Sequence, residues 1–165
     1  MARRGRAALL LVVGAVLVGA IGCGEEGAEE GARLSVYASA PLRKGEAGAG
    51  RKFCAEAREA ARQAGDPGGF ELRVVCLDAS GPGGRWTLAQ VGANARRATE
   101  DSATVAYLGE PERAARRQSQ PIIEAAGIAA LGGLSGRAAM TEVAKAIEEG
   151  DSGEPRRAVF DAVEG

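Results

Sequence analysis

Apolar and polar positions recur with two different periods from residue 33 onward, and the two periods alternate along the chain. Residues 33–39 (RLSVYAS) alternate around Leu34, Val36 and Ala38, a spacing typical of a strand. Residues 47–64 instead place apolar side chains three and four positions apart, which predicts a helix. The patterns repeat and predict strands at 33–39, 70–77, 104–108 and 128–131, and helices at 47–64, from Thr87 to Ala98, and at 112–126 with a kink at Pro121.

Each predicted helix has one apolar face that can cover a sheet. The expected buried positions are Phe53, Ala57, Ala60, Ala61 and Ala64 in the first helix and Leu88, Val91, Ala95 and Ala98 in the second. Residues 70–77 (FELRVVCL) are apolar on both sides, which predicts a strand covered on both faces. Strands and helices in turn, joined by short connections, predict an α/β fold: a parallel sheet of about four strands with helices on both faces.

The pattern changes after residue 131, because two helices follow with no strand between them. The expected apolar faces are Met140, Val143, Ala144 and Ile147 in a helix over 139–149, and Val159, Phe160 and Val163 in a last helix that Pro155 can open. One domain is therefore expected at 33–165, with a βαβαβαβ part at 33–131 and closing helices at 137–165. Ligands on parallel sheets usually bind where the strands end, which here is 39–43, 78–84, 109–113 and 132–135.

The first 22 residues have the three-part layout of a secretory signal. Residues 1–6 are basic, residues 7–21 are apolar without a charge, and Cys23 follows small residues. This end resembles a bacterial lipoprotein processing box, which implies cleavage before Cys23 and lipid on that cysteine. An uncleaved signal anchor and twin-arginine export through Arg3 and Arg4 are the alternatives. Residues 23–32 would be the lipidated cysteine and a flexible acidic tether, holding an extracytoplasmic domain at a bacterial membrane.

The other two cysteines, Cys54 and Cys76, are an even pair if Cys23 carries lipid. Disulfides persist in exported chains, so the two residues form a bridge or remain as two buried thiols.

Composition and motifs exclude several classes of function. Histidine is absent, which excludes a Ser-His-Asp triad, a Cys-His pair and any histidine-containing zinc site. The net charge of −1 does not favour nucleic acid. No phosphate-binding motif and no rigid set of metal ligands occurs, so we expect no enzyme, no cofactor and no metal. Arg96-Arg97 and Arg116-Arg117 are expected on solvated helix faces.

Five segments resemble the first lobe of the extracytoplasmic solute-binding proteins of branched-chain amino-acid ABC transporters. They are LSVYASAPL at 34–42, GFELRVVCLD at 69–78, GANARR at 92–97, VAYLGE at 105–110 and PIIEAAGI at 121–128. This Leu/Ile/Val-binding protein family has a type I periplasmic-binding-protein-like fold of two lobes. Residues 136–147 and 157–163 resemble its C-terminal end, and only 132–135 stands in place of its second lobe. The resemblance therefore implies a single lobe with a helical C-terminus.

The resemblance also implies a function and a site. It implies a lipoprotein that binds a small amino acid and works with an ABC transporter permease, with ligand contacts at Ser39, Leu42, Gly109, Glu110, Arg113 and Ser135. Arg113 and Ala114 stand where the family commonly carries a serine–glycine pair, so the site is expected to be degraded, although arginine can still grip a carboxylate. One lobe alone cannot enclose a ligand, and affinity should fall by several orders of magnitude.

Two other interpretations stay open. These positions can be ordinary loop residues, and the chain can be an interaction module that forms a homodimer, or binds a partner protein, through the exposed inter-lobe face. It can also be the truncated remnant of a binding protein.

Overall fold

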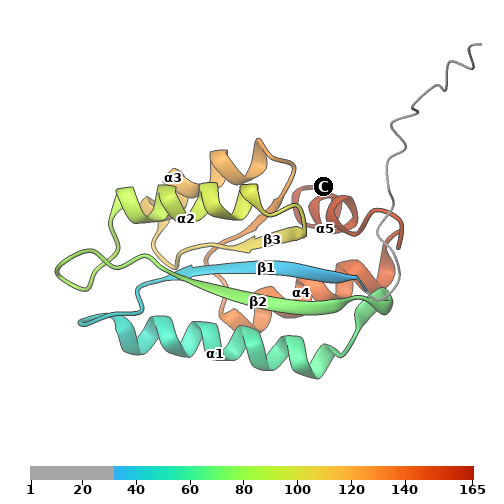
Figure 1. Ribbon diagram of the computed structural model, residues 1–165, viewed down its shortest axis with the longest axis horizontal. Helices are drawn as coiled ribbons and strands as arrows, with labels where there is room; N and C mark the ends of the chain where they lie inside the picture. Colours follow the sequence, from blue (N-terminus) through green and yellow to red (C-terminus); the bar gives the residue numbers. More distant parts are fainter. Residues whose placement is uncertain (1–31) are drawn as a thin grey trace, which may run out of the picture.

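Strands and helices alternate through the part of the chain that the computed structural model describes, residues 32–165 (Figure 1). In chain order the elements are β1 (Arg33–Ala40), α1 (Ala47–Ala64), the short 3-10 helix η1 (Pro67–Gly69), β2 (Glu71–Asp78), α2 (Leu88–Glu100), β3 (Thr104–Leu108), α3 (Arg113–Glu124), β4 (Ala129–Leu131), α4 (Gly136–Glu149) and α5 (Pro155–Glu164). The predicted signal, Cys23 and the acidic tether up to residue 31 lie outside the described residues.

The four strands form one sheet in the order β2-β1-β3-β4, and every neighbouring pair is parallel. Helices α1 and α4 pack together on one face, and α2 and α3 pack on the other (Figure 1). Helix α5 packs on β3 and β4. This confirms the predicted α/β class, the parallel sheet and the helices on both faces.

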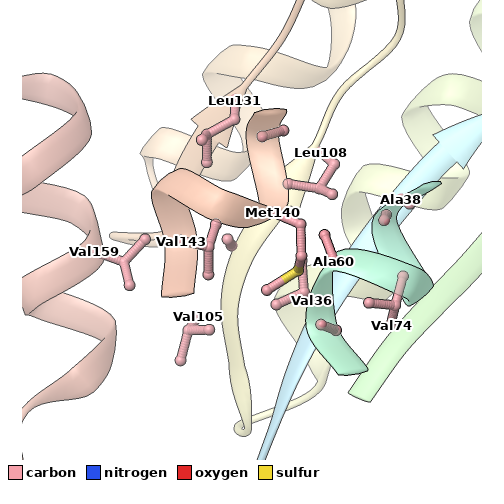
Figure 2. Close-up of a cluster of buried hydrophobic side chains, with 14 of the residues drawn as sticks. Val36, Ala38, Ala60, Val74, Val105, Leu108, Leu131, Met140, Val143 and Val159 are labelled. Atoms are coloured by element: carbon pink, nitrogen blue, oxygen red, sulfur yellow. The ribbon is translucent and has the colours of Figure 1, made fainter. Parts of the chain in front are cut away.

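The larger core lies between the sheet and the helices α1, α4 and α5. Met140 and Val143 of α4 are fully buried beside Val36, Leu108 and Val105 from the two central strands (Figure 2). Val159 of α5 is buried in the same cluster. The opposite face has a smaller core, in which Tyr37, Tyr107, Ala95 and Ile123 are buried. Alanine and glycine are frequent in these helices, which lets backbones approach closely: a Cβ at Gly136 of α4 would lie 2.0 Å from the carbonyl oxygen of Phe53.

Several sequence predictions need correction. Ala64 is exposed at the last position of α1, and Leu88 is 56% exposed at the first position of α2. Strand β2 has apolar side chains in the cores on both faces, as expected, but it is only partly buried because it is an edge strand. Helix α3 continues through Pro121 and ends at Glu124, and α4 begins at Gly136, three residues earlier than predicted.

A disulfide joins Cys54 of α1 to Cys76 of β2, with the two Cα atoms 6.1 Å apart. Cys54 is buried where α1 crosses the sheet, so the bridge fastens this helix to the edge strand. Strand β2, like β4, has only one neighbouring strand in the sheet.

Candidate functional site

All four strands run in the same direction, so their carboxyl ends meet along one side of the sheet, at the left in Figure 1. We call this side the strand-end edge. It consists of the loops at 41–46, 79–87, 109–112 and 132–135. Parallel α/β sheets usually bind ligands at this position. The edge has two halves, each with a cavity.

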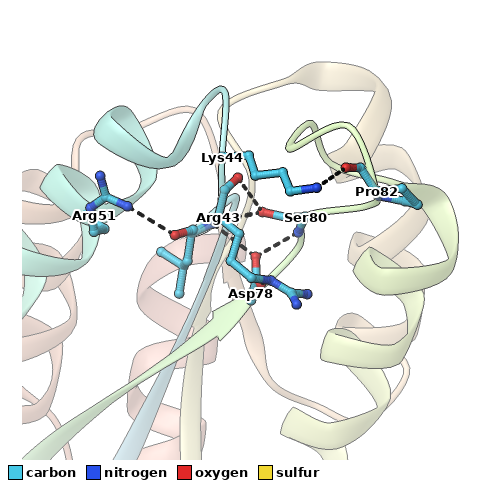
Figure 3. Close-up of polar contacts among 7 residues, drawn as sticks. Arg43, Lys44, Arg51, Asp78, Ser80 and Pro82 are labelled. Carbon is cyan, nitrogen blue, oxygen red and sulfur yellow. Dashed lines mark hydrogen bonds and ion pairs between the residues drawn. The ribbon is translucent and has the colours of Figure 1, made fainter.

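The first half is held together by Asp78, the last residue of β2. The backbone N–H of Leu42 donates to Asp78 Oδ1 at 3.0 Å and to Ser80 Oγ at 3.0 Å, and the N–H of Ser80 donates to Asp78 Oδ1 at 2.8 Å. The guanidinium of Arg43 pairs with Asp78 Oδ2 (Figure 3). Lys44 donates to the carbonyl of Pro82 at 3.1 Å. The two loops are therefore cross-linked by hydrogen bonds.

These contacts set the protonation state of Asp78. Partial burial alone would raise the pKa of its carboxyl, but the hydrogen bonds from Ser80, from the Leu42 N–H and from Arg43 outweigh burial and lower the pKa to about 2. Asp78 therefore stays ionised at neutral pH, as a fixed negative charge under two cationic side chains.

The first cavity, which we call the Arg43 cavity, opens between these two loops and has a volume of about 400 Å³. It is lined by residues that include Arg43, Lys44, Ser80, Gly81, Thr87 and Gln90. Thr87 also caps α2, since its hydroxyl accepts a hydrogen bond from the N–H of Gln90, as predicted.

The second half rests on a buried chain of polar side chains. The amide of Asn94 donates to Ser39 Oγ at 3.0 Å. Tyr107 contacts Ser39 and donates its hydroxyl to Glu110 Oε1 at 2.9 Å, and Ser119 donates to Glu110 Oε2 at 2.8 Å. All five residues are buried, and Glu110 is fully so. Buried polar groups need partners, and here each side chain supplies one to the next.

The network keeps Tyr107 protonated. Burial raises the pKa of its phenol well above the ordinary value, and the nearby charge of Glu110 raises it further. Tyr107 therefore acts as a permanent hydrogen-bond donor to Glu110. Both carboxylate oxygens of Glu110 are occupied by hydroxyl groups, one from β3 and one from α3.

The second cavity, which we call the Arg116 cavity, lies above this network and has a volume of about 170 Å³. It is lined by residues that include Tyr107, Gly109, Arg116, Ser119, Gln120 and Gly132. Arg116 is half-buried here, contrary to the expectation of a solvated helix face, whereas Arg117 is exposed.

The structure distributes the predicted site residues over several roles. Ser39 and Glu110 belong to the buried network. Leu42 offers its N–H to Asp78 and Ser80, inside the protein. Gly109 donates its N–H to the carbonyl of Leu131 and lines the Arg116 cavity.

Two predicted residues lie apart from the network. Arg113 is exposed at the first position of α3. Ser135 is exposed and caps α4, since its hydroxyl accepts from the N–H of Ala138 at 3.2 Å. Sequence reasoning missed Asn94, Tyr107 and Arg116 as site residues, and it found no partner for Ser119. The one available signal was a tyrosine hydroxyl inside an apolar strand.

Within residues 32–165, no three acidic, cysteine or histidine side chains come together to hold a metal ion. Over the same range, no helix has the length and the hydropathy needed to span a membrane.

Comparison with known proteins places the fold. No protein-family model matches this chain, and no curated protein sequence matches it. Among solved structures, it is similar to the leucine-binding protein LivK from Thermotoga maritima MSB8, with 21% sequence identity and a TM-score of 0.52 over 60% of this chain and 27% of that protein. A possible leucine/isoleucine/valine-binding protein from Rhodopirellula baltica SH 1 matches with 19% identity and a TM-score of 0.47, over 60% of this chain and 26% of that protein.

The chain therefore has the parallel α/β fold found in part of a solute-binding protein, and the predicted resemblance is confirmed at the level of the fold. It covers about a quarter of the length of these two proteins.

Proposed function

We propose that this chain is a membrane-anchored extracytoplasmic lipoprotein whose single α/β lobe binds a small solute at the strand-end edge. The observation that carries the proposal is the pair of cavities at this edge, both lined in part by polar and charged side chains, where parallel α/β sheets usually bind ligands. The likeness of fold to a leucine-binding protein supports binding of a solute over catalysis.

The groups at the edge favour a solute that carries a carboxylate. Arg43 and Lys44 bring cationic groups to the first cavity, and Arg116 brings one to the second. A small amino acid is the first candidate, because the similar structure is named for leucine. One lobe leaves half of a solute facing water, so binding should be weaker than in a two-lobed binding protein. The site supplies only the contacts that one of the two lobes would supply.

Anchoring is proposed through lipid on Cys23, with an ABC transporter permease as the partner that receives the solute. The test of anchoring is a Cys23→Ser variant expressed in a bacterial host. Wild-type protein should label with a fatty-acid probe and sediment with membranes, whereas the variant should do neither. Equal membrane attachment of both proteins would contradict lipidation and favour an uncleaved anchor.

Solute binding is tested by thermal unfolding of a fragment that begins at Gly24, with a panel of free amino acids and other small acids in excess. A solute that binds only the folded state must raise the midpoint. A cooperative transition shifted by a member of the panel supports the proposal. A cooperative transition that no solute shifts contradicts it, and the absence of any cooperative transition points to a remnant.

One observation favours a second function, an interaction module. The two large hydrophobic residues exposed in the described chain are Leu88, directly after the strand-end edge, and Leu134, within it. A homodimer or a partner protein could cover them. Sedimentation velocity tests this: a dimer that dissociates in a Leu88→Ser, Leu134→Ser double variant would favour this function.

A further inference from the structure

Arg116 presents a guanidinium to the second cavity without a carboxylate to neutralise it. It forms no ion pair within residues 32–165, although it is half-buried. The nearest acidic group in the network, Glu110, has both carboxylate oxygens taken by Tyr107 and Ser119 and does not line the cavity. A partly buried charge with no opposite charge beside it is unfavourable. Such a group tends to bind a ligand of opposite charge.

The side chain of Arg116 is held in a fixed position from two sides. One terminal nitrogen donates to the backbone carbonyls of Glu110 at 3.0 Å and Pro111 at 2.5 Å. Its methylene stem lies along Gly132: a Cβ at that glycine would meet Arg116 Cδ at 2.0 Å. The planar group also lies 3.4 to 3.6 Å from the Cβ position of Gly133, whose φ of +80° favours glycine.

This arrangement leaves donors for a ligand. The Nε and the second terminal nitrogen of Arg116 form no hydrogen bond within the described chain. Such a fork of N–H groups matches the two oxygens of a carboxylate. Because the fork is already oriented by Glu110, Pro111 and Gly132, little conformational entropy is lost when a ligand binds.

The rest of the cavity limits the ligand. No carboxylate lines it, so an ammonium group entering it would meet a guanidinium with no acidic partner. Its volume of about 170 Å³ is close to the ~150 Å³ cavity known to hold a benzene molecule, which has six heavy atoms. Acetate, propionate and pyruvate have at most six heavy atoms, whereas leucine has more.

We propose that the Arg116 cavity binds a small monocarboxylate without an amino group, with Arg116 as the residue that grips its carboxylate. This inference rests on the proposed function and specifies the solute class of one half of the strand-end edge. It transfers to Arg116 the role that the sequence suggested for Arg113, whose side chain is exposed at the start of α3.

The experiment titrates the purified full chain in detergent micelles with pyruvate, propionate and acetate by calorimetry, with sodium chloride at equal ionic strength as the salt control and leucine as the amino-acid comparison. The variants are Arg116→Gln, which removes the fork, and Gly132→Ala, which displaces it. Their matched controls are Arg117→Gln, an exposed neighbour, and Gly48→Ala in α1, where a Cβ has open space.

We expect at least one monocarboxylate to bind wild type, Arg117→Gln and Gly48→Ala with equal affinity. Binding should weaken at least tenfold in Arg116→Gln and in Gly132→Ala. Each variant is checked for folding by circular dichroism, and where Arg116→Gln fails to fold, Gly132→Ala decides.

The proposal would be overturned if a monocarboxylate bound wild type, Arg116→Gln and Gly132→Ala with the same affinity. Binding of leucine without binding of any monocarboxylate would also overturn it, although the proposed solute-binding function would then stand. If neither leucine nor any monocarboxylate binds a folded wild-type chain, this inference fails, and the thermal-unfolding test with the wider panel of solutes decides the proposed function.

Discussion

Asp78 shows how much one residue contributes to the strand-end edge. Its carboxylate accepts hydrogen bonds from the N–H groups of Leu42 and Ser80 and pairs with Arg43, so it connects two loops. Asp78→Ala should lower the free energy of unfolding by roughly 2 kcal/mol, because hydrogen bonds to a charged acceptor are among the stronger ones. Urea denaturation at pH 7 measures this. Glu71→Gln is the control, since Glu71 pairs with Arg33 at an exposed site where such pairs contribute little.

The same carboxylate predicts a pH dependence. The pKa of Asp78 is about 2 in the folded chain against an ordinary value of 3.8, so the unfolded chain binds the proton more tightly. Its contribution to stability is therefore complete above pH 4 and is lost as the pH falls towards 2. Wild type should lose more stability over this interval than Asp78→Ala does. Parallel curves of unfolding free energy against pH for the two proteins would contradict the assignment.

Two glycines in the first turns of α1 make a matched pair. A Cβ at Gly48 has nothing within 4 Å, whereas a Cβ at Gly50 would lie 1.8 Å from the carbonyl oxygen of Pro41. Gly48→Ala should stabilise by about 0.5–1 kcal/mol, because alanine restricts the unfolded chain and favours helix. Gly50→Ala should destabilise by at least about 2 kcal/mol, since the strand-end loop must move. Thermal unfolding of both variants tests this, and effects of the same sign would contradict the packing.

Single residues at the site could be predicted only in part. Ser39 and Glu110 were implied by the resemblance to the binding-protein family, and both lie in the segments 39–43 and 109–113, where the predicted strands end and parallel sheets bind ligands. Their partners Asn94 and Ser119 come from two different helices, and no local pattern links positions that far apart. Arg116 looked like a solvated residue because it stands in a charged run; only the closeness of Gly132, from another loop, shows that its side chain turns inward.

The elements were easier to predict than the site. Strand β3 and helix α1 have the predicted bounds. The periodicity of α1 extends over 18 residues, and Gly65 ends the helix with a φ of +68°. Errors occur where position in the sheet decides burial. Strand β2 has the composition of a covered strand but is only partly buried because it lies at an edge, and Leu88 fits the apolar face of α2 but is exposed at the first position of that helix.

The disulfide between α1 and β2 predicts that the folded chain is less stable when this bridge is reduced. It closes a chain segment with a sequence separation of 22 residues. Restricting the unfolded chain over such a loop corresponds to about 3 kcal/mol in the chain-entropy model. Unfolding by urea should therefore occur at lower concentration after reduction with dithiothreitol, which leaves the native packing of Cys54 in place.

A Cys54→Ala, Cys76→Ala double variant is the control for that prediction, because reduction should not change its stability. Peptide mapping without reductant should recover a linked peptide pair containing the two residues. Equal stability of oxidised and reduced wild type, or two separate thiol peptides, would contradict the bridge.

At the scale of the whole molecule, the fold matches about a quarter of the length of the similar leucine-binding protein, and the closing helix α5 covers β3 and β4. Val159 is fully buried there, and Arg156 donates to the carbonyls of Thr104 at 2.8 Å and Ser102 at 2.5 Å. These contacts tie the end of the chain to the loop before β3. The lobe therefore has its own core on both faces of the sheet, as expected of a unit that folds by itself.

A single lobe also makes a prediction about motion. Two-lobed binding proteins close about a hinge when a ligand binds, whereas this lobe has one continuous sheet with its helices packed on it. A fragment of residues 32–165 should have a radius of gyration of about 14 Å by small-angle X-ray scattering, the value for a compact domain of its length. That radius should stay the same when a solute that raises the unfolding midpoint is added in excess. A smaller radius with solute would show a closing motion that the single sheet does not allow, and a clearly larger radius without solute would favour the dimer through Leu88 and Leu134.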